Sequence, residues 1–185
     1  YTCWGQFTAL NKYYRQGERT VFNDVIINDD SLTILGDIFH PDSLNLRNVC
    51  VFRTDTNGVI SKIKVLYDPM GLSPNLISEN VKLTQTLDGG FIFTSGPFTN
   101  PSSFFLFKLS YNFDIDFVKE IELGKCNVYD IKVLEVENSY FIGLDVCTQN
   151  GNDHDYCIVK TDLQGNKLWH KFYGTEDNYE WLRNI

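Results

Sequence analysis

The side chains best suited to chemistry gather in one short polar stretch, residues 150–155, which reads Asn-Gly-Asn-Asp-His-Asp. Its carboxylate and amide oxygens are of the kind that calcium prefers. The spacing of an EF-hand loop is absent, because no Glu stands at the twelfth position. We therefore interpret the stretch as a solvated hairpin tip, and we expect neither a metal nor a cofactor.

Other catalytic patterns are missing from the sequence or incomplete. The three histidines, at positions 40, 154 and 170, are far apart, and neither a Gly-x-Ser-x-Gly motif nor a phosphate-binding Gly-rich loop is present. Asp162, Gly165 and Trp169 resemble the tryptophan docking motif of quinoprotein dehydrogenases, but the Asp–Gly spacing is one residue too short. We interpret them as a turn followed by an outer-strand aromatic, and we predict no catalytic residue.

Charge and hydropathy exclude two classes of partner. The 185-residue chain has a net charge of −8, and its 16 basic residues are scattered rather than clustered. Nucleic-acid binding needs clustered Lys and Arg, so we expect none. The sequence contains no run of about 18 apolar residues, the length that a transmembrane helix requires, so we expect no transmembrane segment.

The chain begins with Tyr1 rather than Met, so we expect a mature form or a fragment.

Five cysteines leave the disulfide state open. Cys147 and Cys157 lie symmetrically about Asn152, so a hairpin centred there would bring them face to face. The alternative is two half-buried thiols without a bond. Cys3, Cys50 and Cys126 have no obvious mates.

The sequence repeats itself with a period near 53 residues. Residues 50–55 read Cys-Val-Phe-Arg-Thr-Asp and are followed by Gly58, while residues 157–162 read Cys-Ile-Val-Lys-Thr-Asp and are followed by Gly165. The stretch that begins at Phe105 matches both, 55 residues after Cys50 and 52 residues before Cys157. A fixed period of this size is typical of repeat architectures.

Each repeat contains four short strand patterns separated by turn signals. In the third repeat the strands are expected at 128–136, 140–144, 156–161 and 168–173, with turns at 137–139, 150–151 and 162–165. The first repeat predicts strands at 21–27, 32–39, 49–54 and 59–67, and the second at 80–87, 91–94, 104–109 and 117–123. Several strands, such as 104–107, are apolar on successive residues, which indicates burial on both faces.

These patterns predict an all-β fold, a β-propeller-like array of three four-stranded antiparallel blades at about 21–67, 80–123 and 127–173. Partial blades are expected at both ends, as terminal strands 1–14 and 178–185. A β-sandwich is the alternative, although it would not show a registered repeat. Three blades cannot close a ring, so we favour a fragment of a larger propeller over end strands that pair into a partial fourth blade. We expect such a chain to self-associate or to expose apolar surface.

The repeats resemble a bacterial propeller family of secreted and surface proteins, notably those of Bacteroidetes that use the type IX secretion route. The resemblance rests on Asp-Gly-Gly-Phe-Ile at 88–92, Lys-Thr-Asp at 160–162, Gly-Asn at 165–166 and the strand from Trp169 to Gly174. It implies a propeller fold and a secreted or cell-surface, extracytoplasmic location. The first repeat departs from the pattern at 28–31, and the second has Phe113 where the turn Gly is expected.

Function is expected in the loops of one face, where the longest loops are predicted at 40–48, 68–79, 97–103, 148–156 and 174–178. The predicted function is a non-catalytic secreted or cell-surface module that binds protein or glycan through this face. The alternative is a fragment of a propeller enzyme, a hydrolase or quinoprotein-like, whose catalytic residues lie in missing blades. The candidate binding residues are polar loop residues: Asp68, Asn75, Asn100, Asn152, Asp153, His154, Asp155, Glu176 and Asp177.

Overall fold

The computed structural model describes residues 20–28, 30–40, 43–66, 76–77, 82–97, 102–124, 126–148 and 154–174. These residues form strands and turns, with no helix among them, so none of them forms a helix able to cross a membrane. The chain divides into two compact units, Tyr1–Ile77 and Ser78–Ile185. The expected terminal strands, 1–14 and 178–185, lie outside the described residues.

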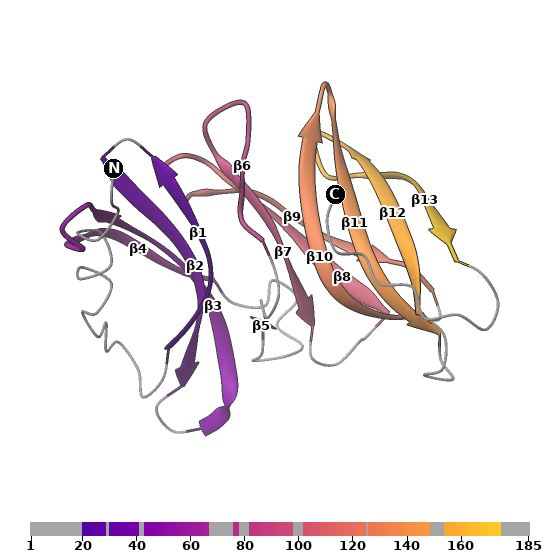
Figure 1. The fold of residues 1–185 in the computed structure, drawn as a ribbon, viewed down its shortest axis with the longest axis horizontal. Coiled ribbons are helices and arrows are strands. Elements are labelled where there is room, and N and C mark those ends of the chain that lie inside the picture. The colour runs from indigo at the N-terminus through magenta and orange to yellow at the C-terminus, as the bar shows by residue number, and fades with distance from the viewer. Residues whose placement is uncertain are drawn as a thin grey trace, which may run out of the picture. The chain divides into compact units, whose positions relative to one another are not determined.

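The first unit contains one antiparallel sheet, called blade one here (Figure 1). Its strands follow each other in chain order: β1 (Thr20–Asn28), β2 (Ser31–His40), β3 (Ser43–Asp55) and β4 (Ile60–Leu66). A two-residue strand, β5 (Leu76–Ile77), lies at the end of the unit. Val, Ile and Thr recur along these strands, because β-branched side chains fit the pleat of a sheet.

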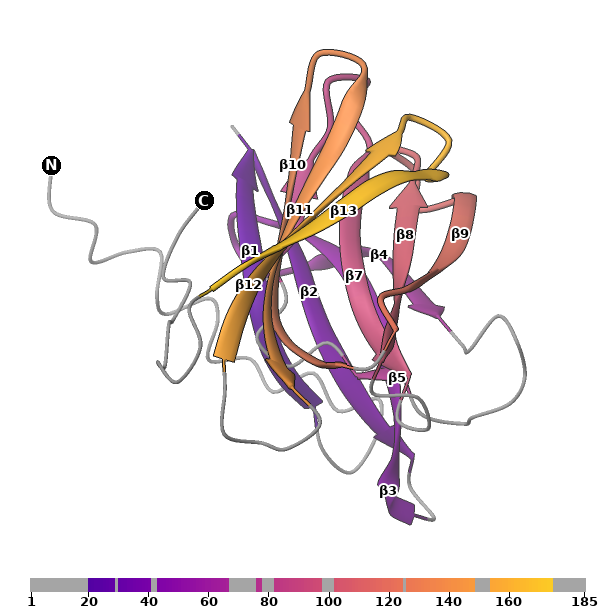
Figure 2. The ribbon, with the colours of Figure 1, turned by 90° about the vertical axis from the view of Figure 1, so that its right-hand side faces the viewer.

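The second unit contains two sheets. Blade two consists of β6 (Thr84–Gln85), β7 (Phe91–Pro97), β8 (Ser103–Leu109) and β9 (Ile115–Glu122). Blade three consists of β10 (Cys126–Val136), β11 (Ser139–Thr148), β12 (His154–Asp162) and β13 (Lys167–Tyr173), again in chain order. The strands of blade three, β10 to β13, are labelled in Figure 2. The expected three four-stranded antiparallel sheets are thus confirmed.

The core of the second unit lies between blades two and three. Ile92, Phe104 and Leu106 of blade two form one apolar cluster with Ile142 and Leu144 of blade three. Every residue of β8 is buried, as the unbroken apolar run predicted. A blade of this kind is covered on both faces, so its strands cannot alternate between apolar and polar residues.

Three sequence predictions about the lengths of loops and strands were wrong. The long loop expected at 40–48 is mostly strand, because β3 already begins at Ser43, and the loop expected at 148–156 is shortened by β11 and β12. Conversely, the strand expected at 80–87 is reduced to Thr84–Gln85, because a tight turn closed by Thr86 and Gly90 begins directly after it. Hydrogen bonds between paired strands, and those that close the turn, decided where the strands end. The weak preference of single residues for strand or loop conformation had less effect.

Phe113 explains how the second repeat does without its turn glycine. It adopts a φ of 61°, the left-handed conformation that Gly58 and Gly165 adopt at the equivalent positions. Its ring is fully buried and packs edge-on against Phe91, with ring centroids 5.7 Å apart. Burying a large ring offsets the cost of about 1–2 kcal/mol for this conformation.

The disulfide considered between Cys147 and Cys157 does not form, and both residues are buried thiols. In the register of β11 and β12, Cys147 pairs with His154, whereas Cys157 pairs with Leu144. Because side chains alternate between the faces of a strand, the two thiols point to opposite faces of the sheet. The required Cβ–Cβ approach is therefore out of reach.

Candidate functional site

The first strands of blades one and three each contain a β-bulge near their beginning. In β1 the register shifts between Phe22 and Asp24, and in β10 it shifts between Val128 and Ile131. A bulge bends its strand and re-aims a side chain, and bulges are frequent beside active sites. We call this edge of each blade, where the first strand starts and the second strand ends, the loop edge.

Opposite each bulge region the second strand carries a buried aspartate. Gly36 pairs with Cys50 and Leu144 pairs with Cys157, so the next residues, Asp37 and Asp145, occupy equivalent repeat positions. Their exposed fractions are 0% and 2%. Charged residues are rarely buried this deeply unless they are paired, which makes a repeated one notable.

The bulge in β1 places a hydrogen-bond donor next to the Asp37 carboxylate. The amide Nδ2 of Asn23, the extra residue of the β1 bulge, donates a hydrogen bond to Asp37 Oδ2 at 3.2 Å. The Asp37 carboxylate also affects the thiol of Cys50. Burial and the negative charge of Asp37 together raise the pKa of Cys50 to about 12. Cys50 is therefore a neutral thiol and not a nucleophile.

In blade two the equivalent position lacks a carboxylate. Ser95 pairs with Phe105, so the residue that corresponds to Asp37 and Asp145 is Gly96. Of the three sheets, blades one and three therefore carry the loop-edge aspartate. Sequence reasoning missed these residues, although Asp37 and Asp145 precede the aligned Cys50 and Cys157 by 13 and 12 residues. The one-residue difference conceals the match until the strand register is known.

Acidic residues also gather at the opposite edge, which we call the turn edge, where the tight hairpin turns lie. Lys108 Nζ lies 2.8 Å from Asp88 Oδ2 and 3.2 Å from Asp116 Oδ2. Thr86 Oγ1 and the Gly90 amide also donate to Asp88 Oδ1. Burial alone would raise the pKa of Asp88, but these hydrogen bonds from Lys108, Thr86 and Gly90 outweigh it and hold the pKa at about 2.

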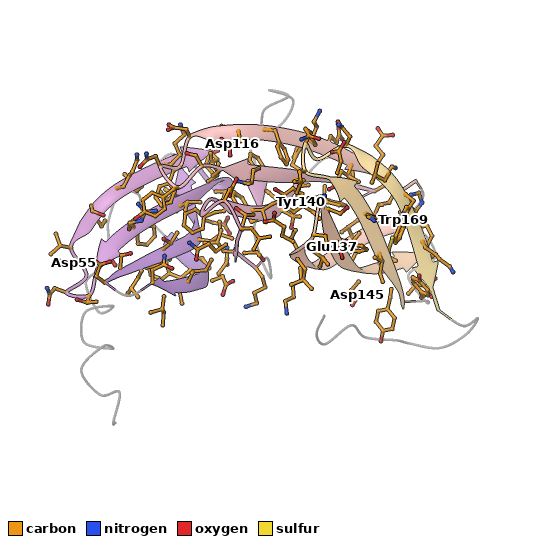
Figure 3. The ribbon with its side chains drawn as sticks, turned by 90° about the horizontal axis from the view of Figure 1, so that it is seen from above. Asp55, Asp116, Glu137, Tyr140, Asp145 and Trp169 are labelled. Carbon is orange, nitrogen blue, oxygen red and sulfur yellow. The ribbon has the colours of Figure 1, made fainter. Side chains whose placement is uncertain are left out.

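Blade three contributes Tyr140 to this turn-edge cluster. Burial, together with the negative charges of Glu135, Asp88 and Asp116, raises the pKa of the Tyr140 hydroxyl. Glu135 also accepts a hydrogen bond from the Leu87 amide at 2.8 Å, which joins the two blades. Figure 3 labels Asp116 on blade two, and Tyr140 and Glu137 on blade three. Lys108 pairs with Asp88 and Asp116, and the Leu87 amide donates to Glu135, so groups within the protein pair with these three carboxylates.

The Asp162–Gly165 turn confirms the structural interpretation of the motif that ends in Trp169. Asp162 Oδ1 accepts hydrogen bonds from the backbone amides of Gln164 and Asn166, as Asp55 does from Asn57 and Val59 in blade one. The Trp169 ring packs against Phe141, with centroids 6.2 Å apart.

Of the nine candidate binding residues, the structure describes the side chain of Asp155 alone. Asp155 is half-buried, and its carboxylate lies so near Gly174 that it would overlap a Cβ added to that residue. His154 begins β12, and its side chain is not among those described. Asp68, Asn75, Asn100, Asn152, Asp153, Glu176 and Asp177 lie outside the described residues, so these binding assignments stay predictions. Within the described ranges, no group of three His, Cys, Asp or Glu side chains could hold a metal ion.

Comparison with known proteins identifies the architecture. No protein-family model and no curated protein matches the chain. Among solved structures, an exo-beta-1,3-galactanase from Clostridium thermocellum matches with a TM-score of 0.58 and 15% identity, over 83% of this chain and 35% of the other. The three sheets are blades of a β-propeller.

Other propeller-like matches agree. A GH43 beta-1,3-galactosidase matches with a TM-score of 0.54 and 17% identity, over 85% of this chain and 32% of the other. A subtype N10 neuraminidase-like protein of A/little yellow-shouldered bat/Guatemala/060/2010 matches with a TM-score of 0.51 and 13% identity, over 84% of this chain and 43% of the other. The chain thus spans roughly a third to two fifths of these three structures. At such identities the matches show the propeller fold alone, and the resemblance to type IX-associated repeats stays a prediction.

Proposed function

We propose that this chain supplies blades to a propeller glycoside hydrolase, and that its loop edge faces the substrate. The observation that carries the proposal is an arrangement found in both blade one and blade three. In each of these blades the first strand contains a β-bulge, and the second strand carries a buried aspartate, Asp37 or Asp145. The fold likeness to galactanase and galactosidase structures supports it and suggests β-galactosides as the substrate class. This assignment favours the enzyme over the non-catalytic module that the loop composition suggested.

The chemistry of glycoside hydrolysis suits these residues. Most such enzymes use a pair of carboxyl groups that flank the scissile bond, one as acid and the other as base or nucleophile. Blades in a propeller repeat around a central channel, so equivalent edges of different blades belong to one face of the ring. Each of Asp37 and Asp145 would supply a carboxylate at the loop edge of its own blade. Asn23 would hold Asp37 in place through its hydrogen bond at 3.2 Å.

A panel of aryl glycosides, led by an aryl β-galactoside and a β-1,3-linked galactan, tests the proposal on the natural full-length polypeptide. Asp37→Asn and Asp145→Asn should each lower kcat/KM by about 100-fold or more, as loss of acid–base catalysis does. Asp114→Asn is the matched control, because Asp114 is exposed in the turn between β8 and β9. Full activity in both loop-edge variants, or a folded protein inert toward every glycoside, would overturn the proposal.

A second candidate function is a non-catalytic binding module, secreted or on the cell surface, that contacts glycan or protein through its loop face. Gly96 favours it, because blade two has no carboxylate at the loop-edge position. Glycan-array binding without turnover, unchanged in Asp145→Asn but weakened in Asp155→Ala, would support this function against the hydrolase.

A further inference from the structure

The last strand of each blade borders the outer side of its sheet. β4, β9 and β13 each end the strand order, so among the described strands each has a ladder partner on one side only. We call the other side the outer side of the strand. In a propeller the neighbouring blades cover the faces of a sheet, so the outer side of its last strand stays at the rim. Unpaired backbone N–H and C=O groups there form a template for another chain, unless charges, proline or a bulge protect them.

Two of these three strands are protected by charge. β4 carries Lys62 and Lys64, and none of its side chains is among the exposed large apolar ones. β9 carries the exposed Glu120 and Glu122, and Ile115, at 48%, is its one well-exposed large apolar side chain. All three strands, β13 included, carry a bulge near their start. The side chains, rather than the bulges, therefore distinguish the three strands.

The outer strand of blade three is exposed along its whole length and carries no acidic residue. Leu168 is 56% exposed and Trp169 is 42% exposed. Phe172 and Tyr173 are both 41% exposed. An outer strand that exposes so many apolar side chains is a predicted site of association with another chain.

Contacts within the chain already hold several of these side chains in place. The His170 ring meets the Phe172 ring edge-on, with centroids 5.3 Å apart. Lys171 Nζ lies 5.0 Å from the centroid of the Tyr173 ring. Side chains that are ordered beforehand lose less conformational entropy when a partner binds.

The order of side chains along β13 is self-complementary about His170. When two copies of the strand run antiparallel with His170 opposite His170, Trp169 of each copy lies opposite Lys171 of the other. Leu168 of each copy then lies opposite Phe172. A cation beside an aromatic ring, and two apolar side chains beside each other, are favourable cross-strand pairs.

The other symmetric registers are less favourable. A ladder centred on Lys171 places two copies of Lys171 opposite each other, and one centred on Trp169 places Lys167 opposite Lys171. Both registers oppose like charges, which is destabilising. Centres nearer either end pair fewer residues of the strand. A shift by one residue is incompatible with two-fold symmetry, because opposite residues share a face of the sheet and successive residues do not.

We propose that two copies of this chain associate through the outer sides of their β13 strands, which pair antiparallel about His170 and join two blades into one continuous sheet. Such an interface is isologous, because both copies use the same surface, and it closes at a dimer. The proposal depends neither on the glycosidase assignment nor on the number of blades in the ring, because it uses a strand at the rim.

Light scattering coupled to size exclusion tests the proposal on the natural full-length polypeptide. The mass of the wild type should rise with concentration from one chain to two and no further. Trp169→Lys should weaken association by at least about tenfold, because it places a lysine opposite Lys171 at two symmetric positions. Trp169→Glu should weaken it by no more than about threefold, because a carboxylate opposite Lys171 is an attractive pair.

A charge exchange tests the register directly. Trp169→Lys combined with Lys171→Glu should recover the association that Trp169→Lys alone loses, because unlike charges then lie opposite each other again. Ile115→Lys is the matched control, because Ile115 is an exposed apolar residue on the outer strand of blade two. It should leave the association unchanged.

Circular dichroism checks that each variant folds. If Trp169→Lys unfolds, His170→Lys replaces it, since it places two lysines opposite each other at the centre, with His170→Gln as its neutral control. A wild type that keeps the mass of one chain at all concentrations would overturn the proposal. Equal losses in Trp169→Lys and Trp169→Glu, no recovery in the charge exchange, or an equal loss in Ile115→Lys would overturn it as well.

Discussion

At the turn edge of the blades, aspartates are exposed and bonded within their own hairpins, whereas at the loop edge they are buried against bulged strands. Asp88 is 63% exposed, yet Lys108, Thr86 and Gly90 all donate to it. Asp37 and Asp145 are almost fully buried, next to strands whose ladders are interrupted. A carboxylate that ties a turn together serves stability. Burying a carboxylate is costly unless it is paired, and the bulge residue Asn23 supplies one partner for Asp37.

The largest expected effect lies at the turn edge, at Gly165. Gly165→Ala should destabilise the protein by about 3 kcal/mol, through a left-handed φ that costs about 1–2 kcal/mol and overpacking that costs about 1–3 kcal/mol. Gly89→Ala is the matched control, because Gly89 has a similar φ of 81° with nothing within 4 Å of its Cβ position. Chemical denaturation measures both. Equal losses of unfolding free energy in the two variants would show that the close approach of Gly165 to the Phe117 ring of blade two contributes nothing to stability. The turn edge would then not join the two blades.

Next in size is the buried cation of the turn edge. Lys108→Met should cost about 2 kcal/mol, because it removes charge-assisted hydrogen bonds to Asp88 and Asp116. Lys160 stands at the equivalent place in blade three, but its Nζ lies 5.1 Å from the Phe141 ring centroid. Lys160→Met should therefore cost only about 0.5–1 kcal/mol. A larger drop in denaturation midpoint for Lys160→Met than for Lys108→Met would show that the bonds of Lys108 to Asp88 and Asp116 are not the stronger of the two interactions.

A smaller effect concerns acid stability. The pKa of Asp88 is about 2 in the folded protein against 3.8 ordinarily, so its contribution to stability is present above pH 3.8 and is lost as the pH falls toward 2. Asp88→Asn should reduce the dependence of stability on pH between about pH 3.8 and pH 2. The dependence on pH above that window should stay unchanged. Thermal unfolding followed between pH 5 and pH 2 gives the comparison. An unchanged slope would mean that the hydrogen bonds to Asp88 do not favour its ionised form.

The smallest expected effect lies at the loop edge. Asp37→Asn keeps the size of the side chain and an oxygen that can accept the hydrogen bond from Asn23, so the unfolding free energy should change by about 1 kcal/mol or less. Removing the negative charge should also lower the pKa of Cys50 from about 12, although burial, the larger cause, keeps it raised. Thiolate absorbance across a pH titration measures this shift. A loss of several kcal/mol would make Asp37 a structural group and remove the contrast between the two edges.

Strand and turn positions could be predicted from this sequence because they depend on local chemistry. The Asp-Gly-Gly turn at 88–90, the glycines at positive φ and the doubly buried run of β8 all follow from residue type and period. The turn at Phe113 was also placed correctly, even though no glycine stands there. Local preference was enough wherever neighbouring residues along the chain make the deciding contacts.

Loop lengths, thiol pairing and the candidate site could not be predicted in this way. Cys147 and Cys157 appear symmetric in the sequence, but the register of β11 against β12 separates them to opposite faces. The equivalence of Asp37 and Asp145 is hidden by a one-residue difference and becomes clear only when each is paired across its sheet. The repeat in the sequence determined the blades, because it fixes which residues form strands. Tertiary structure decided which aspartates are buried, because burial depends on strand register and on bulges that no local pattern specifies.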